Sequence, residues 1–172
     1  MNYVRASVHL CLMHVCVCLF IFDVCVALWR ADRGGVVSQN SKRYHTFREG
    51  RYPLPNDESE QYRGDLNSYL FRDVMDGATY LSPLPEEGPE KVLELGTGTG
   101  SWAIDMAERF PDCEIVGVDL SRIQPGFMPN VDFQVDDVES EWLHPTDFDF
   151  IFMRELSVYI QDPSKLFERA FQ

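Results

Sequence analysis

Residues 92–102 read VLELGTGTGSW, and this short stretch decides how the chain is expected to fold. An apolar run typical of a buried strand is followed by three glycines at alternate positions and then by a helical pattern. Gly96 and Gly98 can adopt positive φ angles and present backbone N–H groups, while Gly100 lets the helix start close to the strand. The helical residues expected to face inward are Trp102, Met106 and Phe110. The stretch predicts a nucleotide-binding loop, with a tight turn that binds nothing as the alternative.

Acidic residues around the loop narrow the choice of nucleotide. Glu94 lies two residues before the first glycine, at the strand end, where a carboxylate can meet a ligand's ammonium group. Asp119 follows the first glycine by 23 residues, near the distance at which an acid reaches ribose hydroxyls. Residues 136–138 (DDV) end a third apolar run, where a carboxylate and the next backbone amide can bind an adenine edge. These features indicate a nucleoside with a cationic amino-acid tail and no phosphate, which describes S-adenosylmethionine.

Other interpretations of the same residues stay open. A nicotinamide dinucleotide site would use the glycines and Ser101 together with Asp119, although Glu94 would then lie unfavourably close to the pyrophosphate. Each acid also has a simpler explanation. Glu94 can be a solvated strand end, Asp119 a helix cap or turn residue, and residues 136–137 part of a turn.

From residue 91 onward, short β-rich runs alternate with helical or turn segments. This alternation predicts a parallel sheet with crossover connections, the doubly wound, Rossmann-like α/β class. The expected strands cover residues 91–95, 113–120, 131–136 and 148–153, and a final helix covers residues 163–171.

Residues 44–90 are expected to form a helical extension, preceded by a polar, aperiodic linker at residues 31–43. Asn56 or Asp57 can cap a helix that ends near Gly77. Apolar residues recur along this helix at three- to four-residue spacing, and we expect this face to pack against the rest of the domain. The face consists of Tyr62, Leu66, Tyr69, Leu70 and Val74.

The first thirty residues contain an apolar run from residue 8 to residue 28. As a helix, this run would be about 32 Å long, enough to cross a bilayer core, and the basic residues after it favour leaving the domain in the cytosol. A cleaved signal peptide and a wrongly assigned start are the alternatives. Four of the five cysteines lie within residues 11–25, where we expect neither a disulfide framework nor a zinc site.

The composition, 45% apolar and 25% charged over 172 residues, is that of one globular domain. It excludes collagen, a disordered tail and a disulfide-built miniprotein. The net charge is −13, and residues 51–172 alone hold nine basic and 25 acidic side chains. Because this surface would repel a phosphate backbone, direct nucleic-acid binding is not expected.

Five stretches of the sequence carry a resemblance to a known family. They are RYHTFREGRYPLPND (43–57), LELGTGTGSWAIDMAERFP (93–111), VGVDLSRIQP (116–125), DDVESEW (136–142) and FDFIFMREL (148–156). In these stretches the sequence resembles class I S-adenosylmethionine-dependent methyltransferases and, among them, the fungal LaeA-like group. The glycine motif alone is typical of the whole superfamily, whereas its combination with the other stretches is more specific.

The resemblance implies which residues contact the cofactor. Those at the methionine end would be Glu94, Gly96, Thr97, Gly98 and Gly100; those at the ribose Asp119 and Leu120; those at the adenine Asp137 and Val138; and those near the reacting methyl Met153 and Arg154. Members often carry a histidine pair in the upstream helix, where this chain has Asn67, Ser68 and Tyr69, so the resemblance assigns that helix no acceptor role.

The resemblance also implies a seven-stranded sheet in the order 3-2-1-4-5-7-6. This chain would hold only the first four strands, so residues 91–172 are expected to be a partial domain, incomplete at the C-terminus. The fourth strand would then be an exposed edge with Phe148, Phe150 and Ile151 nearby, which favours aggregation or pairing with another chain.

The expected activity is methyl transfer from S-adenosylmethionine to a small metabolite or a protein, linked to fungal secondary metabolism. The alternative is a non-catalytic, LaeA-like regulator or scaffold with a vestigial pocket and a protein partner. Methyl transfer requires no metal, and the sequence assigns no catalytic residue. His45 and His144 are each a candidate base or, more simply, a surface residue. The resemblance implies a cytosolic or nuclear location, whereas the apolar run implies a membrane.

Overall fold

The computed structural model describes residues 42–45, 47–142 and 147–171. The predicted leader (residues 1–30), nearly all of the predicted linker and His144 lie outside these residues. Within the described part of the chain, no helix is both long and apolar enough to cross a membrane. The membrane segment predicted at residues 8–28 therefore stays a prediction.

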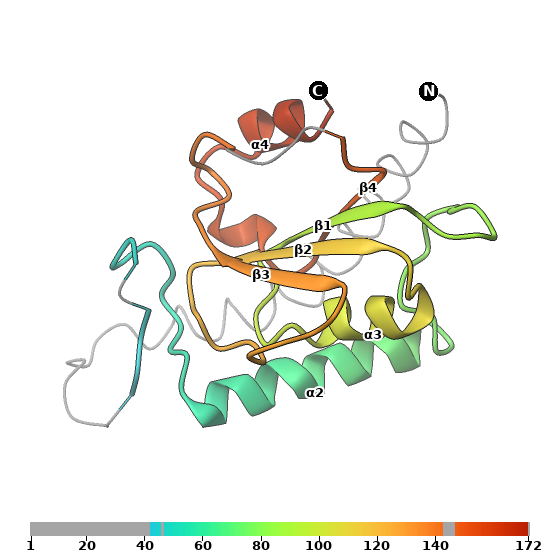
Figure 1. Ribbon diagram of the computed structural model, residues 1–172. Helices are drawn as coiled ribbons and strands as arrows, with labels where there is room; N and C mark the ends of the chain where they lie inside the picture. Colours follow the sequence, from blue (N-terminus) through green and yellow to red (C-terminus); the bar gives the residue numbers. More distant parts are fainter. Residues whose placement is uncertain (1–41, 46, 143–146, 172) are drawn as a thin grey trace.

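A four-stranded parallel sheet forms the centre of the domain (Figure 1). Its strands are β1 (Lys91–Leu95), β2 (Glu114–Asp119), β3 (Val131–Val135) and β4 (Phe150–Met153), in the spatial order β3-β2-β1-β4. This order confirms the predicted α/β class. The strand bounds agree with the predicted runs to within two residues at each end.

Helices cover both faces of the sheet (Figure 1). On one face lies α3 (Ser101–Arg109), whose Trp102 ring stacks on Phe152 of β4 at 3.9 Å between ring centroids, with Met106 fully buried beside it. On the other face, Leu166 of α4 (Pro163–Ala170) packs against Leu93 and its apolar neighbours. The predicted inward positions of α3 are confirmed, and Phe110 packs half-buried at the end of that helix. A short 3₁₀ turn, η1 (Ser157–Tyr159), connects β4 to α4.

Helix α2 (Glu58–Val74) begins as the sequence predicts. The Asp57 side chain accepts a hydrogen bond from the Glu60 backbone N–H at 3.1 Å, which satisfies one of the free amides at the helix start. After the C-cap at Met75, the first left-handed residue is Asp76, with a φ of +53°, and the predicted Gly77 follows it with a φ of +85°.

The orientation predicted for α2 is wrong. The apolar residues that were expected to pack inward are 47% to 76% exposed, and no residue of the helix is fully buried. They are Tyr62, Leu66, Tyr69, Leu70 and Val74. The opposite face of α2 meets α3 and the glycine loop before it instead, through polar groups. Asp65 accepts a hydrogen bond from Thr99 at 2.6 Å, the hydroxyls of Ser68 and Ser101 lie 3.2 Å apart, and Arg72 forms an ion pair with Asp105 at 2.5 Å.

The same helix also borders a pocket. The pocket-lining residues of α2 include Glu60, Arg63 and Ser68, whose polar groups can form hydrogen bonds there. The apolar spacing of a sequence marks a face of a helix but does not say which neighbour covers it.

Strand β4 is the last strand of the described sheet, as predicted, but its apolar side chains are covered. Phe150 is 3% exposed, and Phe148 and Ile151 are half-buried. The predicted exposed edge therefore concerns the backbone of β4, and the three apolar side chains predicted near it are largely covered in the described structure.

Candidate functional site

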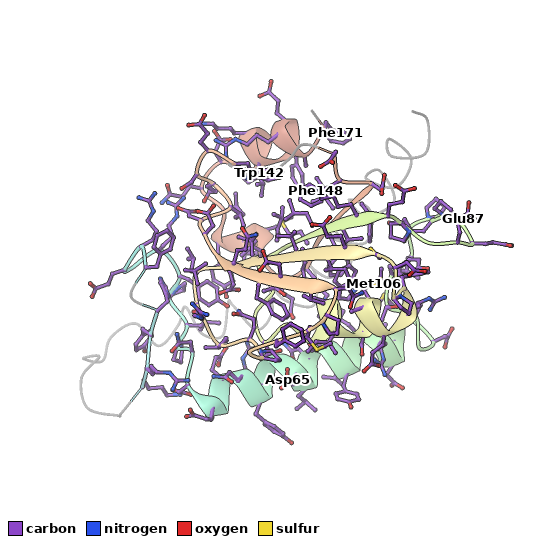
Figure 2. The ribbon with its side chains drawn as sticks, viewed as in Figure 1. Asp65, Glu87, Met106, Trp142, Phe148 and Phe171 are labelled. Atoms are coloured by element: carbon purple, nitrogen blue, oxygen red, sulfur yellow. The ribbon has the colours of Figure 1, made fainter. Side chains whose placement is uncertain are left out.

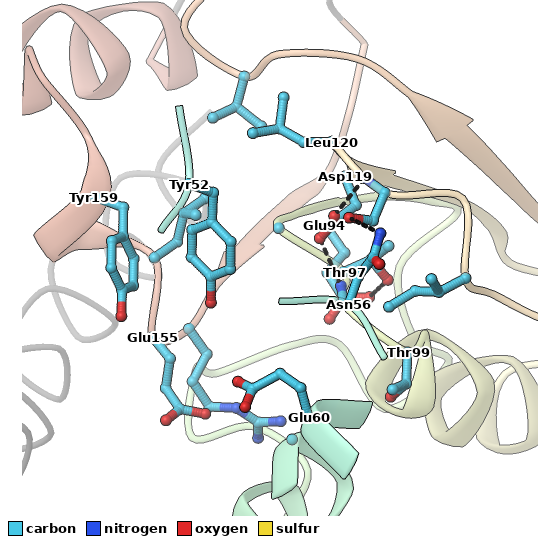
Figure 3. A pocket seen from close by; sticks show the side chains of 18 of the residues that line it. Tyr52, Asn56, Glu60, Glu94, Thr97, Thr99, Asp119, Leu120, Glu155 and Tyr159 are labelled. Carbon is cyan, nitrogen blue, oxygen red and sulfur yellow. Dashed lines mark hydrogen bonds between the residues drawn. The ribbon is translucent and has the colours of Figure 1, made fainter. Parts of the chain in front are cut away.

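A pocket opens at the carboxyl ends of the parallel strands, where open α/β sheets bind their ligands (Figure 3). Three parts of the chain line it: residues 51–68, the loops that follow β1, β2 and β3, and residues 154–160 after β4. Of the ten residues predicted to bind the cofactor, the pocket brings together Glu94, Gly96, Thr97, Gly98, Asp119, Leu120, Asp137 and Val138. Gly100 and Met153 are not among its lining residues.

The glycine loop has the geometry that its sequence predicts. Gly96 and Gly98 have φ angles of +73° and +57°. A Cβ atom added at Gly98 would meet no atom within 4 Å, so this backbone is open to the pocket. Gly100 differs from Gly98 in being closely packed, because a Cβ atom there would lie 2.6 Å from the Phe133 ring. It allows α3 to start against β3, and its prediction as a direct ligand contact stays untested.

Glu94 is a buried carboxyl group at the inner end of the pocket. It is 5% exposed and accepts a hydrogen bond from the Thr97 hydroxyl at 2.5 Å. Burial is the main cause that raises the pKa of Glu94 from its ordinary 4.5 to about 8; the Thr97 hydrogen bond and the charge of Arg154 act in the opposite direction. A buried carboxylate is stabilised by a cationic partner, so this position suits a ligand with an ammonium group.

Asp119 ties the end of β2 to the glycine loop. One carboxylate oxygen accepts from the Gly98 backbone N–H at 2.9 Å, and the other accepts from the Ser121 backbone N–H at 2.8 Å. Burial raises the pKa of Asp119, while these backbone hydrogen bonds lower it. A carboxylate can accept about four hydrogen bonds, so Asp119 retains capacity for the hydroxyls of a ribose.

The predicted adenine-binding residues follow β3. Asp136 accepts a hydrogen bond from the Asp137 backbone N–H at 2.7 Å, and Asp137 accepts one from the Glu139 backbone N–H at 3.0 Å. Asp137 also lies 3.8 Å from the guanidinium groups of Arg48 and Arg51. Its carboxylate is thus held in place at the pocket wall.

Met153 and Arg154 are both predicted near the reacting methyl, but only Arg154 lines the pocket. Met153 packs in the apolar cluster on the α4 face of the sheet. Arg154 lines the pocket, lies over the Phe71 and Phe152 rings, and donates a hydrogen bond to Ser68 at 2.8 Å.

The described residues contain no group of three or more histidine, cysteine or acidic side chains that could hold a metal ion.

The N-terminal extension forms a side of the pocket that the residues predicted from the sequence do not include. Tyr52, Asn56, Glu60 and Arg63 line it, and the Asn56 amide donates to the Ser121 hydroxyl at 3.2 Å. Within residues 52–57 the sequence predicts a helix cap and part of the family resemblance but no ligand contact, although a tyrosine and an asparagine in such a loop are potential ligand-binding groups. Glu155 and Tyr159, after β4, were missed as well.

His45 is neither at the surface nor in the pocket lining. It is 5% exposed, its Nε2 lies 3.3 Å from the Arg48 carbonyl oxygen, and its Nδ1 has no hydrogen-bond partner among the described residues. The simpler prediction of a surface histidine is wrong for this residue.

The fold and the pocket together define a class of protein. Residues 66–172 match the family model described as a methyltransferase domain, so the chain belongs to the methyltransferase domain family. The plantazolicin methyltransferase BpumL, solved in complex with SAH, has a similar fold at a TM-score of 0.52 and 17% sequence identity. The similarity covers 64% of this chain and 45% of BpumL.

Fungal relatives place the chain more narrowly within that class. It is 40% identical over 135 residues to methyltransferase pytC of Aspergillus terreus, covering 77% of this chain and 41% of pytC. It is 41% identical over 145 residues to the secondary metabolism regulator laeA of Aspergillus fumigatus, covering 81% of this chain and 38% of that protein. The chain thus spans about two fifths of the length of these relatives, and it is related both to methyltransferases and to regulators of fungal secondary metabolism.

Proposed function

We propose that this chain binds S-adenosylmethionine in the pocket and transfers its methyl group to an acceptor. The observation that carries the proposal is the buried Glu94 carboxyl group beside the open glycine loop. When bound, the ligand supplies a methyl group activated by a sulfonium centre. Glu94 would pair with its ammonium group, Asp119 would accept from its ribose hydroxyls, and residues 136–138 would contact its adenine.

The electrostatics of the pocket support this ligand over a nicotinamide dinucleotide. Seven carboxyl groups and three guanidinium groups are among the lining residues. A pyrophosphate at the glycine loop would add negative charge close to Glu94, whereas the ammonium and sulfonium groups of S-adenosylmethionine add positive charge.

We propose a small metabolite or a protein as the acceptor, in fungal secondary metabolism, because one relative is named as a regulator of that process and the other as a fungal methyltransferase. The second candidate function is that of a regulator or scaffold that binds a partner protein without turnover. It is favoured by the 41% identity to a relative named as a regulator. Retention of Glu94, Asp119 and the glycines favours the enzyme.

The deciding experiment is a calorimetric titration of the full chain with S-adenosylmethionine, and separately with NAD. We expect saturable binding of the first and none of the second. Gly98→Arg should abolish binding because its side chain would enter the open space above the loop. Glu87→Gln, an exposed site at the opposite end of the sheet (Figure 2), is the matched control and should bind normally. Binding of NAD, or of neither ligand by a folded sample, would contradict the proposal.

We also propose a cytosolic or nuclear location, with anchoring through residues 8–28 as the alternative. Carbonate washing of a membrane fraction separates the two, because an anchored chain stays in the pellet. Recovery in the soluble fraction with the leader intact would exclude the anchor.

A further inference from the structure

The pocket has a second end that the predicted cofactor contacts leave unused. Figure 3 shows Tyr52, Tyr159, Glu155 and Glu60 on one side of the pocket, and Glu94, Thr97 and Asp119 on the other. The residues of the second end come from the loop before α2, from the first turn of α2 and from the segment after β4. A site for a second ligand beside the cofactor would have this arrangement.

Glu155 is held in the second end at a conformational cost. Its φ angle is +57°, in the left-handed region that non-glycine residues seldom adopt, and residues kept there cluster at functional sites. Its carboxylate accepts a hydrogen bond from the Asn67 amide of α2 at 3.0 Å. Burial raises the pKa of this carboxyl, although Arg154 and Arg63 lower it. The chain therefore maintains a carboxyl group at this place although both its backbone conformation and its burial are unfavourable.

Two tyrosines form an aromatic wall next to this carboxyl group. The rings of Tyr52 and Tyr159 meet edge to face, with 4.6 Å between their centroids and 71° between their planes. Such a wall offers ring surface to an organic molecule and attracts cations through its π electrons.

The cationic side chains of the pocket are already engaged. Arg51 donates to Glu139 at 2.7 Å, Arg63 donates to Glu60 at 2.6 Å, and Arg154 donates to Ser68. With seven carboxyl groups against three guanidinium groups, the lining disfavours a negatively charged ligand.

We propose that this second end is the acceptor site and that it selects neutral or cationic molecules whose hydroxyl or amine donates to Glu155. The inference rests on the proposed methyltransferase function. Methylation of such a group forms a carbon–oxygen or carbon–nitrogen bond, and the methyl–sulfur bond breaks with its electron pair staying on sulfur. One proton is released from the acceptor, and the Glu155 carboxylate takes it before passing it to water.

The test uses three probes that share one phenolic ring and differ in the charge of the other end. They are tyramine (cationic), tyrosol (neutral) and 4-hydroxyphenylacetate (anionic). Each is titrated calorimetrically into the full chain saturated with S-adenosylhomocysteine. We expect tyramine and tyrosol to bind at least about tenfold more tightly than the anion, a difference of about 1.4 kcal/mol.

The variant Glu155→Gln should reduce this discrimination to about threefold or less, and Glu87→Gln should leave it unchanged. If Glu155→Gln does not fold, Glu155→Asn replaces it, because asparagine tolerates a positive φ. Equal or tighter binding of the anion, unchanged discrimination in the variant, or no probe binding to the cofactor-loaded protein would overturn the proposal. Failure to bind S-adenosylhomocysteine at all would instead refute the proposed function on which it rests.

Discussion

Replacing Glu94 by glutamine should stabilise the protein and weaken its cofactor binding. Burial raises the pKa of Glu94 from 4.5 to about 8, so between these pH values the folded protein keeps a proton that the unfolded chain has lost. The free energy of unfolding then falls as pH rises, by at most about 1.4 kcal/mol per pH unit. The loss begins at the unfolded pKa and is complete above the folded one. Glutamine has nearly the same shape and does not ionise, so it escapes this loss.

The expected gain of Glu94→Gln is about 2–5 kcal/mol at pH 8.5, with a much smaller gain at pH 5.5. The upper end of this range is the pKa difference of Glu94 converted to free energy at about 1.4 kcal/mol per unit. The lower end allows for relaxation of the protein around the buried charge. Urea unfolding of the wild-type protein, Glu94→Gln and the exposed control Glu87→Gln at both pH values measures these differences. A variant less stable than the wild type at pH 8.5, or a gain equal at both pH values, would refute the reasoning about the buried carboxyl group.

Cofactor binding should show the opposite effect of the same substitution. We expect Glu94→Gln to weaken S-adenosylmethionine binding by at least about tenfold, because a neutral amide replaces the charged partner of the ammonium group. Wild-type affinity should peak near pH 8. Below it, Glu94 must release a proton to form the pair, and above it the ligand's α-amino group, with an ordinary pKa of about 8, loses its charge. In the variant the acidic limb should disappear, and calorimetry across the pH range tests this.

Three further substitutions test the close packing at Gly100, the open glycine loop at Gly98 and the cap of α2 at Asp57. Gly100→Ala should cost about 2–4 kcal/mol in urea unfolding, because the new methyl group meets the Phe133 ring at a φ of +82°; a cost below 1 kcal/mol would contradict the close approach. Gly98→Ala should cost only about 1 kcal/mol, since its surroundings are open, yet weaken cofactor binding in calorimetry. Asp57→Ala should cost about 1 kcal/mol through the lost cap of α2, and full rescue by Asp57→Ser would confirm capping as the cause.

The sheet and the glycine loop could be predicted from the sequence because their signals are local. The strand at residues 91–95 and the glycines that follow it depend on neighbouring residues, and the structure has the strand within the same bounds. The residues that close the pocket depend on contacts between distant parts of the chain. Asn56 meets Ser121 across 65 positions of sequence, and Asn67 meets Glu155 across 88, and no spacing rule joins such pairs.

The orientation of α2 could not be predicted from the sequence for a related reason. Its spacing of apolar residues marks one face correctly, but the side that meets α3 is chosen by hydrogen-bonding groups such as Asp65 and Ser68. Single polar residues at these positions are indistinguishable in sequence from a solvated helix face. The left-handed conformation of Glu155 has no sequence signal either, because it is imposed by the surrounding structure.

The polar contact between α2 and α3 also determines how this helix would leave the pocket. Because the contact is made of hydrogen bonds and an ion pair, separating the helices would expose little new apolar surface. The opening would therefore have a small heat-capacity change and a small dependence on urea concentration. In native-state hydrogen exchange, we expect the amides of α2 to exchange at nearly the same rate with and without mild denaturant, and faster as salt screens the ion pair. Ionic strength would then change how often the pocket opens on this side, by the small amount that a partly exposed ion pair contributes.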